Sequence, residues 1–203
     1  MTRIATFQLV DRIDGQAKPA ELWDSIEPVH RQQLDNEWRT ALTDLLARTP
    51  EGRREESAGW NWLDKLERRD GKFGTESFAI TCDGMVQAAM ILDLSKASWF
   101  KETSGGSIVY VDFLQTAPWN WKRDWQPTPR YRGLGTIMLR TAIELSRELE
   151  FEGWVGLHSL PQSENFYRKC GMTEFWRDPD YECLSYFEMT AAQANALLNK
   201  GRP

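Results

Sequence analysis

Two closely spaced glycines at the start of an amphipathic helical pattern constrain this chain more than any other feature. Residues 130–136 read Arg-Tyr-Arg-Gly-Leu-Gly-Thr, and Gly133 and Gly135 stand where the helical pattern begins. Glycine lets the backbone approach a ligand closely, and the first turn of a helix presents unpaired N–H groups and the positive end of the helix dipole. The segment therefore predicts an anion-binding loop, and phosphate is the usual ligand of such a loop.

The spacing of these residues separates three kinds of phosphate loop. A dinucleotide-binding loop needs a third small residue at the position of Met138, and the Gly-Lys-Ser/Thr string of a P-loop does not occur. The pattern that fits is Arg-x-x-Gly-x-Gly, read as Arg130, Gly133 and Gly135. A turn that opens a surface helix is the structural alternative.

A second motif follows downstream. After a strand-like run at residues 154–158 comes Phe-Tyr-Arg-Lys-Cys at residues 166–170, followed by Gly171 and Met172. Both motifs, in this order and separation, resemble those of the GCN5-related N-acetyltransferases (GNAT), in which an aromatic residue usually stands in place of Met172. The resemblance covers roughly residues 77–190.

The resemblance implies a fold and a reaction. The GNAT fold is α/β (α+β), a mixed and mainly antiparallel sheet flanked by helices, and the 203 residues fit one such domain over residues 1–203. Family members transfer an acetyl group from acetyl-CoA to a primary amine by direct attack in a ternary complex. Two alternatives stay open: a non-catalytic acyl-CoA sensor or scaffold of the same fold, and an acetyltransferase toxin that acts on aminoacyl-tRNA.

By the same resemblance, the glycine-rich segment binds the pyrophosphate of acetyl-CoA. Its backbone N–H groups are the expected donors, and one of the two arginines adds charge-assisted bonds, unless both are solvated surface charges. The family often has an asparagine where Leu160 stands, so we expect Ser163 or Asn165 to replace its contacts. The predicted cofactor-binding residues are Arg130, Arg132, Gly133, Leu134, Gly135, Thr136, Ser163 and Asn165.

Three residues are candidates for proton transfer: Tyr167, Asp112 and His158. By resemblance, the Tyr167 hydroxyl points at the thiol sulfur as general acid, whereas a core tyrosine is the alternative. Asp112 lies mid-strand on the face of Tyr110, where a carboxylate needs a partner or a role. It is either a base, as in some relatives, or an arginine partner. His158 has a suitable intrinsic pKa for a base, or it is a satisfied histidine at a strand end. A base that acts through water, or no dedicated base, also stays open.

Composition and charge limit the classes of partner and ligand that the protein is expected to bind. The net charge of −5 argues against nucleic acid, because phosphate contacts need clustered Lys and Arg. Two histidines without a Cys-x-x-Cys or His-Glu-x-x-His motif argue against a metal site. No apolar run reaches the length of a membrane span, and three cysteines do not suggest a disulfide framework, so we expect a cytoplasmic protein. Acetyl-CoA is the expected cofactor, a small-molecule or protein amine the expected acceptor, and a homodimer is open.

Periodicity and turn residues predict the remaining elements. A helical pattern starts at Ala20, and we expect Pro28 to split it into two helices. Asp83-Gly84 predicts a β-hairpin, Ser159 and Gln162 a helix capping box, and Gly171 the end of that helix. Other expected elements are strands at 3–10, 107–115, 154–158, 172–176 and 184–189, and helices near 60–66, 134–153, 162–170 and 191–198. The second of the two helices around Pro28 is expected to bury an apolar stripe of Leu34, Trp38, Ala41, Leu42 and Leu45.

Two further segments each allow more than one interpretation. The stretch from Trp119 to Trp125 is either an inserted loop that packs its tryptophans onto the domain, an aromatic wall for the acceptor, or a partner-binding patch. The acidic loop at residues 178–182 is either a solvated turn or a site that attracts a cationic amine.

Overall fold

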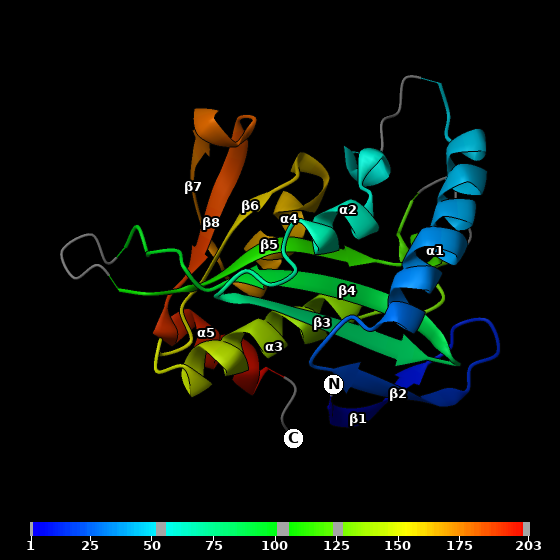
Figure 1. The fold of residues 1–203 in the computed structure, drawn as a ribbon, viewed down its shortest axis with the longest axis horizontal. Coiled ribbons are helices and arrows are strands. Elements are labelled where there is room, and N and C mark those ends of the chain that lie inside the picture. The colour runs from blue at the N-terminus through cyan, green and yellow to red at the C-terminus, as the bar shows by residue number, and fades with distance from the viewer. Residues whose placement is uncertain (1, 52–55, 101–105, 124–127, 201–203) are drawn as a thin grey trace. The chain divides into compact units, whose positions relative to one another are not determined.

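Figure 1 shows the computed structural model of the chain. Its eight strands follow the order β1-β2-β3-β4-β5-β6-β8-β7 in one mixed sheet whose pairings are mostly antiparallel. The prediction of a mixed, mainly antiparallel sheet with helices is thereby confirmed. The structure describes residues 2–51, 56–100, 106–123 and 128–200.

The chain forms two compact units, each assembled from two stretches of sequence. The chain passes from one unit to the other within β4, within β5 and at the start of α3. A single domain over residues 1–203 stays a prediction. The first unit comprises Met1–Ile91 and Leu114–Gly135, and the second comprises Leu92–Phe113 and Thr136–Pro203.

The first unit begins with two antiparallel strands, β1 (Arg3–Val10) and β2 (Ala17–Trp23). The first strand was predicted, but the prediction of a helix from Ala20 is wrong. Strand β2 pairs with β1 on one side and β3 on the other, and it buries alternate side chains, among them Ala20 and Leu22. Pro28 opens the helix α1 (Pro28–Arg48) instead of splitting a longer one, because the first helical turn does not need its missing N–H.

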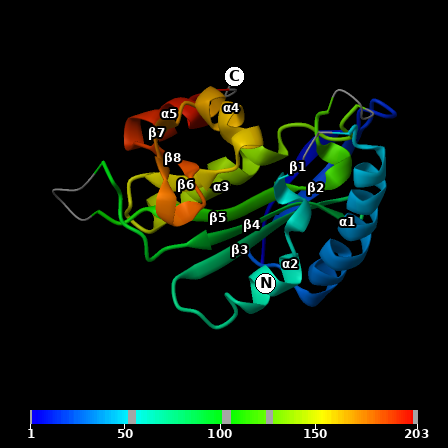
Figure 2. The same cartoon turned by 90° about the horizontal axis from the view of Figure 1, so that it is seen from above.

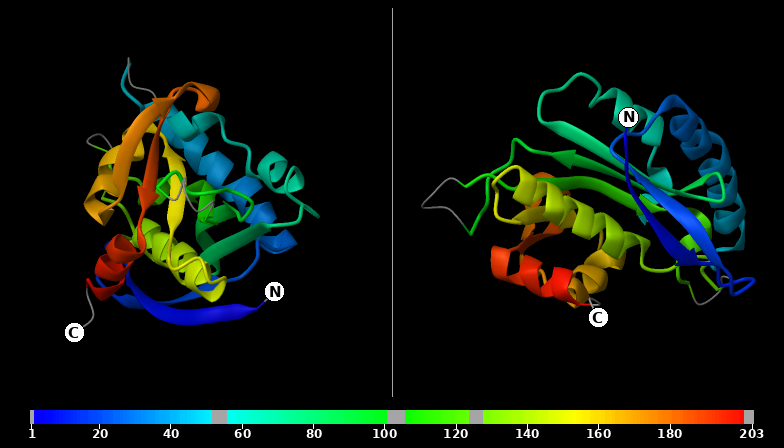
Figure 3. Two further views of the ribbon diagram at one scale, coloured as in Figure 1. Left: turned by 90° about the vertical axis from the view of Figure 1, so that its left-hand side faces the viewer. Right: turned by 90° about the horizontal axis from the view of Figure 1, so that it is seen from below.

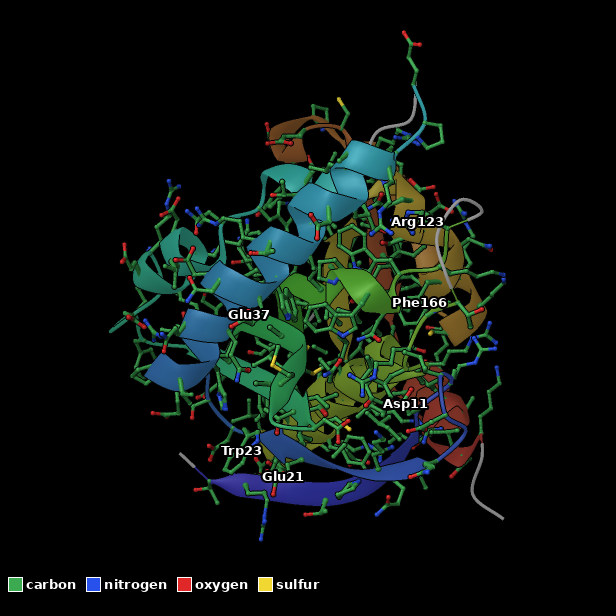
Figure 4. All side chains as sticks on the ribbon, turned by 90° about the vertical axis from the view of Figure 1, so that its right-hand side faces the viewer. Asp11, Glu21, Trp23, Glu37, Arg123 and Phe166 are labelled. Atoms are coloured by element: carbon green, nitrogen blue, oxygen red, sulfur yellow. The ribbon has the colours of Figure 1, made fainter. Side chains whose placement is uncertain are left out.

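Two α-helices of the first unit, α1 and α2 (Trp62–Glu67), lie side by side (Figure 2). The expected apolar stripe of α1 is confirmed at Leu34, Trp38 and Leu45, which are buried, while Ala41 and Leu42 are half-buried. The Trp38 indole N–H donates to the Val86 carbonyl oxygen at 2.9 Å and so ties α1 to β4. Figure 4 draws the side chains of the described residues as sticks and labels Glu21 and Trp23, which lie on β2. The described residues of this unit also form the short 3-10 helices η1 (Glu56–Gly59) and η2 (Pro118–Asn120).

The predicted β-hairpin of the first unit is confirmed. Strands β3 (Thr75–Cys82) and β4 (Met85–Asp93) are joined by Asp83 and Gly84, whose φ angles are +53° and +71°. Two consecutive positive φ angles characterise the tight hairpin turn that Asp-Gly favours.

The second unit is built around β6 (Val155–Ser159). This strand pairs parallel with the start of β5 (Val109–Thr116) and antiparallel with β8 (Leu184–Met189), and β8 also pairs with β7 (Thr173–Asp178). The Arg140 guanidinium donates to the Leu197 carbonyl at 3.0 Å, so the two helices that carry these residues lie together (Figure 3). The predicted α-helices are confirmed as α3 (Leu134–Glu148), α4 (Pro161–Cys170) and α5 (Ala191–Asn199). The short 3-10 helix η3 (Pro179–Tyr181) lies within the acidic loop and was not predicted.

The two ends of α4 show one correct and one wrong prediction. Its last residue is followed by Gly171 with φ +89°, as expected for a glycine that ends a helix. The capping box is wrong: Leu160 occupies the N-cap without a side-chain bond, and the Ser159 hydroxyl donates to the Leu160 carbonyl at 2.9 Å. Pro161 at the first position removes one N–H that a cap would otherwise satisfy.

Candidate functional site

The glycine-rich loop leads directly into α3. Gly133 has φ +82°, and a Cβ built on it would meet no atom within 4 Å, so the space over the loop is open. The helix begins at Leu134, whose side chain is buried, and the first N–H groups of a helix have no intrahelical partner. The loop therefore offers backbone donors beside open space, at a helix end that favours negative charge.

The two arginines of the loop have different surroundings. The Arg132 side chain is exposed and forms no hydrogen bond or ion pair with any other residue that the structure describes. The Arg130 guanidinium donates to Asp11 Oδ2 and to Asp83 Oδ2, both at 2.8 Å, within the first unit. Arg130 thus joins the loop to the end of β1 and to the β3–β4 turn, which leaves Arg132 as the free cation.

Asp11 forms the buried side of this cluster, with 1% of its surface exposed. The Ile13 N–H donates to its carboxylate at 3.0 Å, and this bond, together with the Arg130 guanidinium, holds the pKa of Asp11 below its ordinary value. Lys18 Nζ lies 3.4 Å from the same carboxylate. The cluster therefore has a structural role at the base of the loop, which the sequence did not indicate.

Tyr167 is buried on α4, where its ring contacts those of Phe166 and Phe187. Burial raises the pKa of its hydroxyl, so it stays protonated at neutral pH. Within the described residues, this hydroxyl has no hydrogen-bond partner. Of the two residues expected to replace the family asparagine, Ser163 is half-buried and Asn165 is exposed.

A pocket of about 370 Å³ lies within the second unit. It contains one residue predicted from the sequence as catalytic, His158, while Tyr167 is not among the lining residues. Asp112 lies on the face of Tyr110, as predicted, and its charge acts on the phenol of Tyr110. The lining residues are Lys96, Ala97, Ser98, Trp99, Ile108, Tyr110, His158, Asp178, Tyr181 and Tyr186.

Three polar side chains of this pocket form a hydrogen-bonded chain. The Tyr110 hydroxyl lies 2.7 Å from His158 Nδ1, and His158 Nε2 lies 3.2 Å from Asp178 Oδ2. The Tyr181 ring stacks on the imidazole with a centroid distance of 3.9 Å and an interplanar angle of 2°. The imidazole is therefore held in its plane by both nitrogens and on one face by the phenol ring.

The chain of hydrogen bonds fixes the tautomer of His158. Burial holds its pKa below the ordinary value, although Asp178 acts in the opposite direction, so the ring is neutral at pH 7. A neutral ring has one N–H, and only Nε2–H can donate to the Asp178 carboxylate. Nδ1 then accepts the hydrogen bond of the Tyr110 hydroxyl, which burial keeps protonated by raising its pKa. The arrangement is a phenol, a neutral base and an orienting carboxylate in sequence.

A second buried carboxylate supports the same pocket. Glu188 is fully buried on β8 and accepts hydrogen bonds from the Trp99 N–H at 3.0 Å, the Tyr186 hydroxyl at 2.8 Å and the Ser98 hydroxyl. Gly156 makes room for this network, because a Cβ there would stand 2.7 Å from the Tyr186 hydroxyl. No sequence pattern indicated this network, since its members come from two parts of the chain about 90 residues apart.

The tryptophan-rich stretch before the loop packs onto the first unit. The Trp119 indole N–H donates to Gln87 Oε1, and the Trp121 indole N–H donates to the Thr116 carbonyl, both at 2.8 Å. These contacts favour the inserted loop among the three interpretations for these two residues. Trp125 lies outside the described residues.

Two wider observations bear on the class of protein. Over the described ranges, no helix combines the length and the apolar character that crossing a membrane requires. In the same ranges, no group of three or more His, Cys, Asp or Glu side chains is arranged to hold a metal ion.

Comparison with known proteins gives similarity in structure alone. No family model matches the sequence, and no curated protein matches it. A GNAT-family acetyltransferase of Listeria monocytogenes is 12% identical, with a TM-score of 0.56 over 90% of this chain and 99% of that one. FeeM, an N-acyl amino acid synthase from uncultured soil microbes, is 10% identical, with a TM-score of 0.57 over 88% and 93%.

A third similar structure was determined with a ligand. The PaiA N-acetyltransferase of Thermoplasma acidophilum, in complex with coenzyme A, is 12% identical, with a TM-score of 0.50 over 84% of this chain and 98% of that one. These similarities cover most of both chains in each pair. The chain therefore has the GNAT fold that the two sequence motifs predicted.

Proposed function

We propose that this GNAT-fold protein is an N-acetyltransferase that moves an acetyl group from acetyl-CoA to a primary amine. The observation that carries the proposal is the open, glycine-lined N-terminus of α3 on this fold, with an exposed and unpaired arginine beside it. The solved relatives include acetyltransferases and a complex with coenzyme A, which supports the same ligand for this chain.

The residues of the loop fit a pyrophosphate. The N–H groups of residues 132–136 would hold it, since several converging donors at a helix N-terminus bind phosphate oxygens. Arg132 would add a charge-assisted bond. Gly133, at a positive φ, removes the side chain that would otherwise stand over the ligand. Arg130 would support the loop and not contact the ligand, since its guanidinium is paired with Asp11 and Asp83.

The pocket of the second unit would receive the amine. When bound, acetyl-CoA supplies a thioester carbon that accepts the amine and a sulfur that leaves. The amine nitrogen gives up a proton to the Tyr110 oxygen while the Tyr110 proton passes to His158 Nδ1, across 2.7 Å. Asp178 accepts the Nε2–H bond and stabilises the imidazolium that results. We thus favour His158, acting through Tyr110, over Asp112 as the base.

Tyr167 would complete the reaction on the leaving side. Its buried hydroxyl carries a proton and forms no bond to another described residue, so it is available to donate to sulfur. Because burial keeps this phenol protonated at neutral pH, it has a proton with which to hydrogen-bond the developing thiolate.

Isothermal titration with acetyl-CoA and a thiol-release assay test this function. We expect saturable binding in the micromolar range, and thiol release with at least one amine from a broad panel. The absence of saturable binding would reject the proposal. Saturable binding without thiol release from any amine would indicate a non-catalytic sensor instead.

Tyr167→Phe removes only the proposed proton donor. We expect kcat to fall by roughly 10- to 100-fold, the usual order for loss of a general acid, while the Kd for acetyl-CoA stays within a factor of about two because the ring packing is kept. The same calorimetric and thiol-release measurements check both values. Turnover equal to that of the wild type would remove Tyr167 from the mechanism.

Arg130→Gln and Arg132→Gln separate the two arginines. We expect Arg132→Gln to raise the Kd for acetyl-CoA by roughly 10-fold through loss of one charge-assisted bond, with an unchanged Tm. Arg130→Gln should lower the Tm by roughly 4–8 °C, since it leaves the buried Asp11 with a weaker set of partners. Thermal unfolding and titration give both quantities, and the reverse pattern would contradict the assignment.

A further inference from the structure

Lys96 brings a positive charge into the pocket of the second unit. Its Nζ donates to the Tyr181 hydroxyl at 2.9 Å and lies 5.6 Å from the centroids of both the Tyr110 and the Tyr181 ring. The side chain is half-buried, yet no carboxylate of the described residues lies within ion-pairing distance of it. A half-buried ammonium without a counter-ion is unusual, because a buried charge is normally paired.

The ammonium of Lys96 has hydrogen-bonding capacity to spare. It carries three N–H donors, and the described residues accept only one of them, at Tyr181. That bond, with the more distant charges of Asp93 and Asp112, holds the pKa of Lys96 above its ordinary value, so the group is charged at neutral pH. Two donors of a fixed cation therefore remain for a ligand.

The carboxylates around the pocket cannot supply the missing anion. Asp178, the one carboxylate among the lining residues, is bonded to His158 and to the Asp180 N–H. Glu188 is buried, does not line the pocket, and accepts three hydrogen bonds. Among the lining residues, Lys96 is thus the charged group that keeps donors for a ligand, and it lies close enough to His158 to act on that ring.

The walls and the size of the pocket limit the rest of the ligand. Aromatic rings of Trp99, Tyr110 and Tyr186 line it, which favours a flat or apolar group. A volume of about 370 Å³ is at the lower end of ligand pockets, which span roughly 300–1,000 Å³. A single free molecule of amino-acid size fits these limits, whereas a folded protein acceptor could insert only one side chain.

We propose that the acceptor is a free α-amino acid with an aromatic or large apolar side chain, whose carboxylate binds Lys96 while its amine faces Tyr110 and His158. The inference rests on the proposed acetyltransferase function and specifies its acceptor. The amine and the carboxylate of an α-amino acid are joined through one carbon, so both can reach a cation and a base that line the same small pocket.

The step balances without a further reactant. The amino-acid nitrogen forms a bond to the acetyl carbon, and the bond from that carbon to sulfur breaks with its electron pair on sulfur. The ammonium of the acceptor first releases one proton to solvent, and the neutral amine then passes a second proton through Tyr110 to His158 as it attacks. The sulfur takes the proton of Tyr167, and the proton on His158 returns through solvent to the Tyr167 oxygen, which restores both side chains. The products are an N-acetyl amino acid and free coenzyme A.

Matched acceptor pairs test the role of the carboxylate. L-phenylalanine and phenethylamine differ only in that group, and we expect kcat/KM for L-phenylalanine to be roughly 10- to 100-fold higher, the order that one charge-assisted contact supports. Lys96→Met should reduce this ratio to about one. Lys72→Met, which removes an exposed lysine of the first unit, should keep the wild-type ratio.

A binding measurement gives a readout besides turnover. Titration of L-phenylalanine into the wild-type protein saturated with coenzyme A should show binding that Lys96→Met weakens by roughly 10-fold or more. A ratio near one in the wild type, or a ratio that Lys96→Met leaves unchanged, would overturn the inference while the acetyltransferase function stands. Faster turnover of O-phosphoethanolamine than of L-phenylalanine would mean that Lys96 binds a phosphate group instead of a carboxylate. This result would also overturn the inference. No thiol release from any acceptor would overturn both proposals.

Discussion

Gly135→Leu is expected to abolish acetyl-CoA binding, with a Kd raised at least about 100-fold, which corresponds to roughly 2.7 kcal/mol. Gly135 lies in the first turn of α3, whose N–H groups point to the ligand in the proposed complex. A leucine side chain there would stand where the pyrophosphate approaches the backbone, and several donors would be lost together. Since helix dipole effects alone contribute about 0.3–1 kcal/mol each, only the loss of several contacts produces a change of this size.

The control for this variant is Gly59→Leu. Gly59 is exposed in η1, has no positive φ, and a Cβ built there meets no atom within 4 Å. We expect this variant to bind acetyl-CoA like the wild type, with both variants showing far-UV circular dichroism of the folded protein. A Gly135→Leu protein that is folded and still binds within about five-fold of the wild type would mean that the backbone of this loop does not hold the cofactor.

Local patterns in the sequence predicted the elements whose causes are local. The hairpin at Asp83-Gly84 followed from the positive φ angles that these two residues accept, and the end of α4 followed from Gly171. The error at residues 17–23 has a cause of another kind. Ala, Glu, Leu and Trp in succession are compatible with a helix, and pairing with strands on both sides decides in favour of β2.

The same distinction between local and long-range causes applies to the residues of the candidate site. The glycine loop and Tyr167 could be recognised because motifs carry them along the chain. Arg130 and Asp11 are 119 residues apart, and nothing in either neighbourhood indicates that they form a pair. The sequence therefore allowed Arg130 to be a phosphate ligand, whereas its side chain is bonded to Asp11 and Asp83.

The hydrogen-bonded chain in the pocket could not be predicted from the sequence, for a related reason. His158 was a candidate base, but its capacity to act as one depends on its hydrogen bonds with Tyr110 and Asp178, which are 48 and 20 residues away in the sequence. In the sequence, Asp178 belongs to an acidic loop, and no motif marks Lys96. Three strands of the sheet bring these side chains together, so the tautomer of the histidine is a property of the fold.

His158→Gln is the most direct test of that chain. Glutamine can accept the bond of the Tyr110 hydroxyl and donate to Asp178, but it cannot take up a proton, so packing is kept while the base is lost. We expect kcat/KM to fall by roughly 10²- to 10⁴-fold, the contribution typical of a positioned base. His30→Gln is the matched control, because His30 is the other histidine of the sequence, is buried and lies in the first unit, and its kcat/KM should stay within about two-fold of the wild type.

The pH dependence distinguishes a base from a merely structural histidine. The neutral ring is the active form, so kcat/KM of the wild type should decrease as the pH falls through the pKa of His158, which burial places below the ordinary value of about 6.5. Asp178 raises this pKa, so Asp178→Asn should move the midpoint of the acid limb to lower pH and also reduce the maximum, since the carboxylate no longer stabilises the imidazolium. An acid limb that Asp178→Asn leaves in place would show that His158 does not carry the proton of the amine.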